Sequence, residues 1–257
     1  MYFYIYDEFV QNKRFEKELL QIENRLTDLG IAGKVARLAL FRDVEEMVRD
    51  ELRRGVTSVI VVGNDTTVRR VLDVLVEHRV TLGMIPLGEP GVIANVFGLP
   101  VGLPACDVLS ARILETVDAG MINGKRFLTS VSIPKFSGSI AFGDAYRAIV
   151  DHPASVSIRN VALSEPEFGL GVAHPCDGSL ETVVRVQLPR GWKGMLGGKK
   201  IGVSVLPTAA MTLKSEEPVI LTVDGEEMGG SRFDVSVEPG ILKVITGKGR
   251  LFGDCAS

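Results

Sequence analysis

Hydrophobic residues follow two different patterns along this chain, and the change between them falls near residue 120. Up to about residue 118, short apolar runs alternate with segments in which apolar residues recur every three or four positions, as on the buried face of a helix. The runs at 35–40, 56–62 and 81–85 are predicted strands. The predicted helices carry Phe15, Leu19, Ile22, Leu26 and Leu29, then Val44, Met47, Val48 and Leu52 after the capping residue Asp43, and finally Val68, Val71, Leu72, Leu75 and Val76. Such alternation predicts a parallel sheet with helices on both faces.

After Gly120 the apolar runs become short and rich in β-forming residues, with Gly and Pro between them. Seven runs are predicted as strands: 127–133, 155–163, 182–188, 201–206, 219–223, 233–237 and 241–245. Strands separated by turns, without helical segments, favour an antiparallel sandwich or barrel. The chain is therefore predicted to hold an α/β domain at 1–120 and a β-rich domain at 121–257.

Composition agrees with a globular, enzyme-like protein. The 257 residues are 46% hydrophobic and 24% charged, and the net charge is only −3, which gives no electrostatic support for binding nucleic acid. No leader peptide or membrane-spanning run is recognised, so a cytoplasmic protein is expected. Cys106, Cys176 and Cys255 form an odd, widely spaced set, which indicates a reducing compartment and no structural zinc.

Candidate chemistry begins where the strand 56–62 runs into Gly63-Asn64-Asp65-Thr66-Thr67 and a helix starts. Backbone N–H groups and the positive end of the helix dipole converge at such a turn, so it can bind the phosphates of a nucleotide. Asp65 adds a carboxylate able to hold Mg²⁺, and Thr67 adds a hydroxyl donor. The alternative is an ordinary strand-to-helix turn in which Thr66 or Thr67 caps the helix.

A second turn follows the strand 81–85, at Pro86-Leu87-Gly88-Glu89-Pro90-Gly91. The carboxyl ends of parallel strands lie at one edge of a sheet, so Gly88 and Glu89 are expected beside the first turn. Three further motifs come later in the chain: 117–127, which holds Asp118-Ala119-Gly120 and Asn123-Gly124; Asp177-Gly178-Ser179-Leu180-Glu181; and Asp224-Gly225-Glu226, with 237–242 after it.

In this order the five motifs resemble those of the diacylglycerol kinase catalytic family of lipid kinases, which are relatives of NAD kinase. The resemblance covers most of the chain and implies the same two-domain layout, with an active cleft between the domains. It also implies ATP and Mg²⁺ as cofactors and transfer of phosphate to a lipid or other small hydroxyl compound. By position in the motifs, it implies Glu226 as the base and Asp118 as its partner. An alternative for 224–226 is a hairpin turn, because Asp-Gly is a strong turn signal.

The sequence departs from the family on the nucleotide side. The family's opening Asn-Pro-x-x-Gly loop is replaced by a run from Asp7 to Asn12, and two glycines of the phosphate turn are replaced by Asn64 and Thr66. Glu89 places an acid where a phosphate would lie. These changes motivate a second hypothesis, a protein of the same fold that binds a nucleotide or lipid without transferring phosphate. NAD kinase fits less well, because the Asp-Gly-Glu motif is typical of the lipid branch.

One segment, Arg190 to Lys200, holds the only Trp of the chain among cations and glycines. An amphipathic indole beside basic residues is suited to a lipid headgroup region, so Trp192 and Lys193 are predicted to touch a membrane surface transiently. The alternative is a plain Gly-rich connection between strands. The oligomeric state is not predicted.

Overall fold

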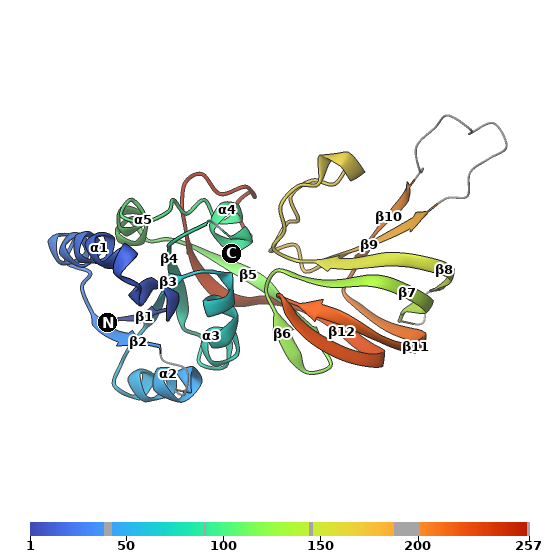
Figure 1. Cartoon of the computed structure of the whole chain (residues 1–257), viewed down its shortest axis with the longest axis horizontal. Coiled ribbons are helices and arrows are strands. Elements are labelled where there is room, and N and C mark those ends of the chain that lie inside the picture. The colour runs from blue at the N-terminus through green and yellow to red at the C-terminus, as the bar shows by residue number, and fades with distance from the viewer. Residues whose placement is uncertain (39–42, 90, 144–145, 188–200, 256–257) are drawn as a thin grey trace.

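The α/β part of the molecule occupies one end and the antiparallel part the other, and the strands β5 and β12 run between them (Figure 1). The computed structural model describes residues 1–38, 43–89, 91–143, 146–187 and 201–255. In the α/β part the strands are β1 (Tyr2–Tyr6), β2 (Lys34–Arg37), β3 (Ser58–Gly63) and β4 (Thr81–Pro86). The helices are η1 (Phe9–Gln11), η2 (Lys13–Phe15), α1 (Glu16–Asp28), α2 (Val44–Arg53), α3 (Asp65–Glu77), α4 (Val92–Val96) and α5 (Ala105–Ala111).

The four strands of the α/β part are parallel, in the order β4-β3-β1-β2. Apolar residues of α2, α3 and α4 cover one face of this sheet, and those of α1 and α5 cover the other. The five apolar residues predicted for α3 are all buried, as the helical spacing requires. The Asp43 side chain accepts hydrogen bonds from Glu45 N and Glu46 N and so caps α2. The predicted parallel sheet with helices on both faces is confirmed.

The remaining part is built almost wholly of antiparallel strands. They are β5 (Ile113–Ile122), β6 (Lys125–Phe127), β7 (Ser130–Phe142), β8 (Tyr146–Arg159), β9 (Leu180–Gln187), β10 (Ile201–Thr208), β11 (Ala210–Val223) and β12 (Glu226–Thr246), with the short helix η3 (Pro166–Phe168) after β8. Their order is β10-β9-β8-β7-β11-β12, and β5 pairs with both β12 and β6. Phe127, Phe136 and Phe233 lie in a separate hydrophobic core that this part encloses. The mainly antiparallel C-terminal architecture is thus confirmed.

Several predicted strands have different limits in the structure. The runs 233–237 and 241–245 belong to one strand, β12, whose register with β5 shifts between Glu238 and Leu242, where Gly240 has a φ of 58°. The run 127–133 is divided between β6 and β7. Strand β5 was not predicted, and the predicted boundary at residue 120 falls within it; the division into two domains therefore stays a prediction.

The end of the chain returns to the α/β part. Val244 of β12 pairs with Leu82 of β4, in parallel. Beyond this strand, Leu251 N donates to Val96 O, and the rings of Phe97 and Phe252 meet edge to face. Strand β12 therefore fixes the antiparallel part to the parallel sheet next to β4.

The cysteine prediction is wrong in one respect. Cys176 and Cys255, 79 residues apart, form a disulfide, while Cys106 is free and buried. Both bonded cysteines lie beside β5, because Asp118 N donates to Pro175 O and Cys255 N donates to a carboxylate oxygen of Glu115. Within the described residues, no group of three or more His, Cys, Asp or Glu side chains could hold a metal ion.

Candidate active site

The turn from β3 into α3 has a different cap from the one predicted. Asn64, with extended backbone at φ −133°, is the N-cap of α3, and its Oδ1 accepts from Thr67 N at 3.3 Å. No residue of the turn 63–67 has a positive φ, so the replacement of two family glycines by Asn64 and Thr66 needs no strained backbone. Thr66 is exposed on the first turn of α3, whose leading N–H groups have no partner inside the helix. The turn can therefore still present N–H groups to an anion.

Thr67 is fully buried and holds the turn against β1. Its hydroxyl donates to the carboxylate of Asp7, whose other oxygen accepts from Phe9 N at 3.1 Å. A Cβ at Gly63 would lie 2.8 Å from Thr67 Oγ1 and 2.9 Å from Asp7 Cβ, so this contact requires glycine there. Asp7 stands where the family's opening loop is replaced, and it was not predicted as a site residue.

The two turns predicted to lie together do so. Gly63 and Pro86 are paired across β3 and β4, and Leu87 N donates to Gly63 O at 3.1 Å. Gly88, with a φ of 79°, and Glu89 are both exposed at this edge of the sheet. The residues predicted to bind the nucleotide, Gly63 to Thr67, Gly88 and Glu89, therefore share the carboxyl edge of the parallel strands.

Asp65 connects the two turns through its side chain. Its Oδ2 accepts from Val92 N at 2.7 Å and from Ile93 N at 3.3 Å, at the start of α4. A Cβ at Gly91 would collide with this carboxylate, so the glycine there makes room for Asp65. Asp65 Oδ1 is buried and has no hydrogen-bond partner within the described residues.

The surroundings of Asp65 favour its protonated form. Burial raises the pKa of Asp65, the N–H groups of Ile93 and Val92 partly offset this, and the negative charge of nearby Asp224 raises it further. A carboxylate with a raised pKa and one unpaired oxygen is suited to accept a proton. Such groups cluster at catalytic sites.

Asp224 was predicted only as part of a motif, yet it makes the most hydrogen bonds of the acids in this region. The alternative of a hairpin turn is confirmed: Val223 pairs with Glu226, and Asp224 and Gly225 have φ angles of 47° and 86°. The Asp224 carboxylate accepts from Leu128 N at 2.7 Å, Thr129 N at 2.9 Å, Thr129 Oγ1 at 2.6 Å and Ser130 N at 3.0 Å. It thereby fixes the connection between β6 and β7.

Glu226 lies among cations. Its carboxylate is ion-paired with Arg69 of α3 and with Lys125 of β6, the latter at 2.5 Å. The hydrogen bond from Lys125, together with the positive charges of Arg69 and Lys125, lowers the pKa of Glu226. A carboxylate with a lowered pKa holds a proton poorly, so its surroundings do not favour Glu226 as a general base.

A second ion-pair group lies beside the first. Arg126 of β6 contacts Glu238 of β12 at 2.6 Å and Asp73 of α3 at 3.0 Å. Helix α3 is thus held to the antiparallel part by charged side chains on both.

Asp118 is buried and separate from Glu226. Its two oxygens accept from Gly240 N at 2.7 Å and Gly178 N at 2.8 Å, and no contact joins it to Glu226 within the described residues. Burial raises the pKa of Asp118, and these two hydrogen bonds partly offset the rise. The structure therefore shows Asp118 binding the loop before β9 to the irregular part of β12, and its predicted partnership with Glu226 stays a prediction.

A pocket of about 360 Å³ lies where α4 meets the antiparallel part. Val92, whose N–H is bound by Asp65, contributes to one side, and Thr129, whose hydroxyl is bound by Asp224, contributes to another. The two nearby carboxylates thus each hold a residue that lines the same pocket. Sequence reasoning did not find this pocket, because its walls come from segments far apart in the chain.

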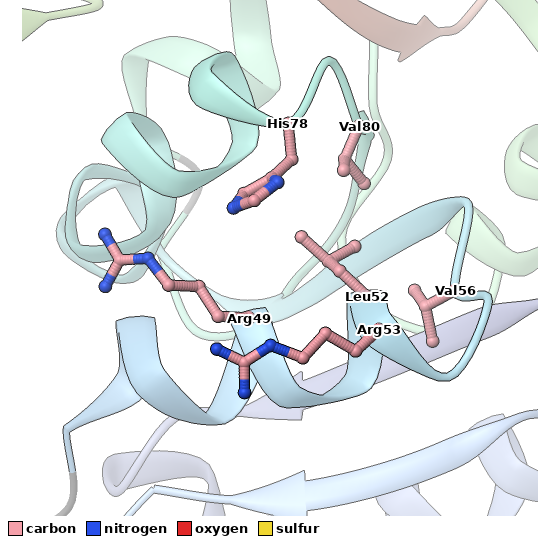
Figure 2. Close-up of a pocket in the computed structure, with 6 residues that line it drawn as sticks. All are labelled: Arg49, Leu52, Arg53, Val56, His78 and Val80. Atoms are coloured by element: carbon pink, nitrogen blue, oxygen red, sulfur yellow. The ribbon is translucent and has the colours of Figure 1, made fainter.

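Another pocket, of about 290 Å³, lies at the opposite edge of the sheet (Figure 2). Arg49 and Arg53 of α2 line it together with His78 and Val80, at the end of α3 and before β4. Arg49 is ion-paired with Glu45 and Glu77, and Arg53 with Asp50. This pocket lies at the amino ends of β3 and β4, whereas the candidate active site lies at their carboxyl ends, so the two are separate.

Comparison with known proteins agrees with the fold and the motifs. Residues 2–122 match the diacylglycerol kinase catalytic domain, so this part of the chain is similar to the diacylglycerol kinase catalytic family. It is 25% identical over 247 residues to a "Probable lipid kinase YegS-like" of Pseudomonas aeruginosa, with 79% of this chain and 80% of that protein covered. It is 26% identical over 128 residues to a diacylglycerol kinase of Bacillus subtilis, covering 48% of this chain and 42% of that protein.

A solved structure of a diacylglycerol kinase from Bacillus anthracis shares the fold of the whole chain. The TM-score is 0.75 at 17% identity, and 97% of each chain is covered. The resemblance inferred from the sequence motifs is confirmed. Among the described residues, no helix is long and apolar enough to cross a membrane.

Proposed function

We propose that this protein transfers phosphate from ATP to the hydroxyl group of a lipid. The observation that carries the proposal is the meeting of the α3 turn, Asp65 and the 360 Å³ pocket at one edge of the parallel sheet. In a chain that is similar to lipid kinases, this arrangement supplies a place for the phosphates, a carboxylate and a cavity for the acceptor.

In this proposal the nucleotide phosphates bind at Gly63 to Thr67, with Gly88 and Glu89 beside them. Asp65 accepts the proton of the acceptor hydroxyl, because burial raises its pKa and its Oδ1 is unpaired. Asp224 positions Thr129 and Ser130 at the acceptor pocket. A base role for Glu226, supported by Asp118, remains the alternative that the sequence motifs suggest.

The described residues do not fit a resident Mg²⁺ site. The four hydrogen bonds to Asp224 occupy its carboxylate, and Asp65 offers one oxygen. Mg²⁺ in kinases is commonly held by one or two carboxylates together with substrate phosphates. In this proposal Mg²⁺ therefore arrives with the nucleotide, as Mg·ATP. Asp65 as a metal ligand stays a prediction.

Binding of Mg·ATP at the α3 turn tests the nucleotide half of the proposal. Thr66→Glu places a negative charge beside the expected phosphates, while a Glu in the first turn is favourable for the helix itself. The variant is expected to bind Mg·ATP at least about tenfold more weakly than wild type in calorimetry. Thr66→Gln, of the same size and without the charge, is the control and should bind nearly as wild type. Absence of heat with wild-type protein at millimolar Mg·ATP would exclude the kinase function.

A second function, binding without phosphate transfer, is favoured by the ion pairs of Glu226. If Glu226 is the only base available, the site lacks a good proton acceptor, because Arg69 and Lys125 are paired with this carboxylate and its pKa is lowered. Wild-type protein would then bind Mg·ATP but label no lipid from γ-labelled ATP. NAD⁺ serves as a control acceptor in that assay, and its phosphorylation would indicate the NAD kinase branch.

The membrane contact predicted at Trp192 and Lys193 lies outside the described residues, and we propose it from sequence alone. Arg190, Lys193, Lys199 and Lys200 should attract anionic lipid by about 1 kcal/mol per residue near the surface, less after screening by salt. Vesicles of anionic lipid are expected to shift the fluorescence of this single Trp to the blue, reversibly with salt. No shift, with protein and vesicles separating on sedimentation, would leave a plain connection between strands.

A further inference from the structure

Two arginines line the pocket between α4 and the antiparallel part, and the Nη atoms of both already donate hydrogen bonds to other groups of the protein. Arg159 of β8 is 2% exposed, and its Nη1 donates to Glu181 at 2.9 Å. Its Nη2 donates to the carbonyls of Leu163 at 2.6 Å and Gly171 at 2.8 Å. This guanidinium therefore binds the backbone of two segments behind the pocket. Both of its Nη atoms are already used in hydrogen bonds within the protein.

The second arginine of the pocket is occupied in a similar way. Arg185 of β9 donates to Ser157 Oγ at 2.9 Å and to Glu165 Oε2 at 2.6 Å. The Nε atoms of Arg159 and Arg185 have no hydrogen-bond partner among the described residues, although Arg159 Nε lies 3.7 Å from Glu165 Oε1 in an ion pair. Two arginines balanced by Glu165 and Glu181 give a pocket with no excess positive charge, which argues against an anionic ligand.

Hydroxyl groups line the accessible part of the same pocket. The side chains of Ser130, Ser132 and Ser164 make no hydrogen bond within the described residues. Each hydroxyl can donate one hydrogen bond and accept others, so together they complement a ligand that carries several hydroxyls. Leu163, which is exposed, and the partly exposed Val92 add an apolar surface to this wall.

We propose that the pocket binds a neutral headgroup that carries several hydroxyls, a sugar or a glycerol unit, and that lipids with such a headgroup are the acceptors. This inference rests on the proposed kinase function and names its substrate class. The apolar surface can contact the C–H groups of such a unit, and the serine hydroxyls, which make no hydrogen bond within the described residues, can bind its O–H groups. The bare hydroxymethyl group of diacylglycerol would contact few of these serines and leave the others to water, and a phosphate headgroup would meet only arginines that are already ion-paired.

The test is phosphate transfer from γ-labelled Mg·ATP to three lipids in mixed micelles: a monoglucosyl diacylglycerol, diacylglycerol and phosphatidic acid. The glucosyl lipid is expected to have the highest kcat/KM. In the double variant Ser130→Ala with Ser132→Ala, the ratio of kcat/KM for the glucosyl lipid to that for diacylglycerol should fall about tenfold, the usual effect of losing one or two hydrogen bonds. Ser139→Ala, on the same strand but away from the pocket, is the matched control.

A preference for diacylglycerol or phosphatidic acid, or an unchanged ratio in the double variant, would overturn the inference. If no lipid is phosphorylated, the proposed kinase function fails, and binding of methyl glucoside by saturation-transfer NMR decides on the pocket separately. A signal that the double variant loses and Ser139→Ala keeps would support the pocket as a sugar site without transfer. No signal with wild-type protein would also overturn the assignment of the pocket as a sugar site.

Discussion

Replacing Asp224 by alanine is expected to lower the free energy of unfolding by about 3–5 kcal/mol, measured by urea denaturation. The carboxylate accepts from three backbone N–H groups and one hydroxyl in the connection between β6 and β7. Without it these donors lose their acceptor, at about 1–3 kcal/mol for each one left buried. Alanine also tolerates the φ of 47° at this position poorly.

Asp224→Asn separates these two causes. Asparagine adopts the left-handed region more readily, and its one carbonyl oxygen can still serve Thr129 and Ser130, so a loss of about 1–3 kcal/mol is expected. Glu227→Ala, at an exposed position in the same hairpin, controls for a general effect on the strand. A loss below about 1 kcal/mol for Asp224→Ala would show that the turn 128–130 is held without this side chain.

The α/β part could be predicted well because its signals are local. A helix such as α3 shows its buried face in the spacing of Val68, Val71 and Leu75, and a buried strand such as β3 shows as a continuous apolar run. Both signals lie within about a dozen neighbouring residues, so one sequence is enough to find them.

The connection between the two parts was less predictable. Strand β5 mixes Glu115 and Asp118 with apolar residues, because one end crosses the α/β part and the other enters the antiparallel part, and no single period survives. Strand β12 looks like two strands because Pro239-Gly240 interrupts it, although the chain continues in the same direction. Pairing with distant partners overrides the local pattern in both cases.

In the candidate site, the backbone turns were predictable and the side-chain contacts were not. The motif at 63–67 identified the turn, and parallel topology placed Gly88 and Glu89 beside it. The contacts of Asp7 with Thr67 and of Asp65 with the start of α4 join segments 60 and 27 residues apart. The same holds for the disulfide between Cys176 and Cys255, which an odd cysteine count does not reveal.

The opposite surroundings of Asp65 and Glu226 lead to the prediction with the largest effect on rate. Asp65→Asn keeps the oxygen that accepts from Val92 and Ile93 and removes only the proton acceptor, so α4 stays capped. Its kcat is expected to fall about 10²–10⁴-fold with Mg·ATP affinity nearly unchanged, the usual loss for a missing general base. The acid limb of the wild-type pH–rate profile should lie above the ordinary Asp range, since the pKa of Asp65 is raised, and should vanish in the variant.

Glu226→Gln is the matched comparison, because it keeps an acceptor for Lys125 and removes the charge of the other candidate base. Its kcat should fall less than about tenfold, since a carboxylate whose pKa is lowered by Lys125 and Arg69 contributes little as a base. The reverse pattern, with Glu226→Gln losing about 10²–10⁴-fold and Asp65→Asn nearly active, would give the base role to Glu226, as the motifs suggest. A third pattern, weaker Mg·ATP binding by Asp65→Asn at an unchanged kcat, would place Asp65 on the metal side of the nucleotide. The separation of kcat from nucleotide affinity therefore decides which carboxylate takes the proton.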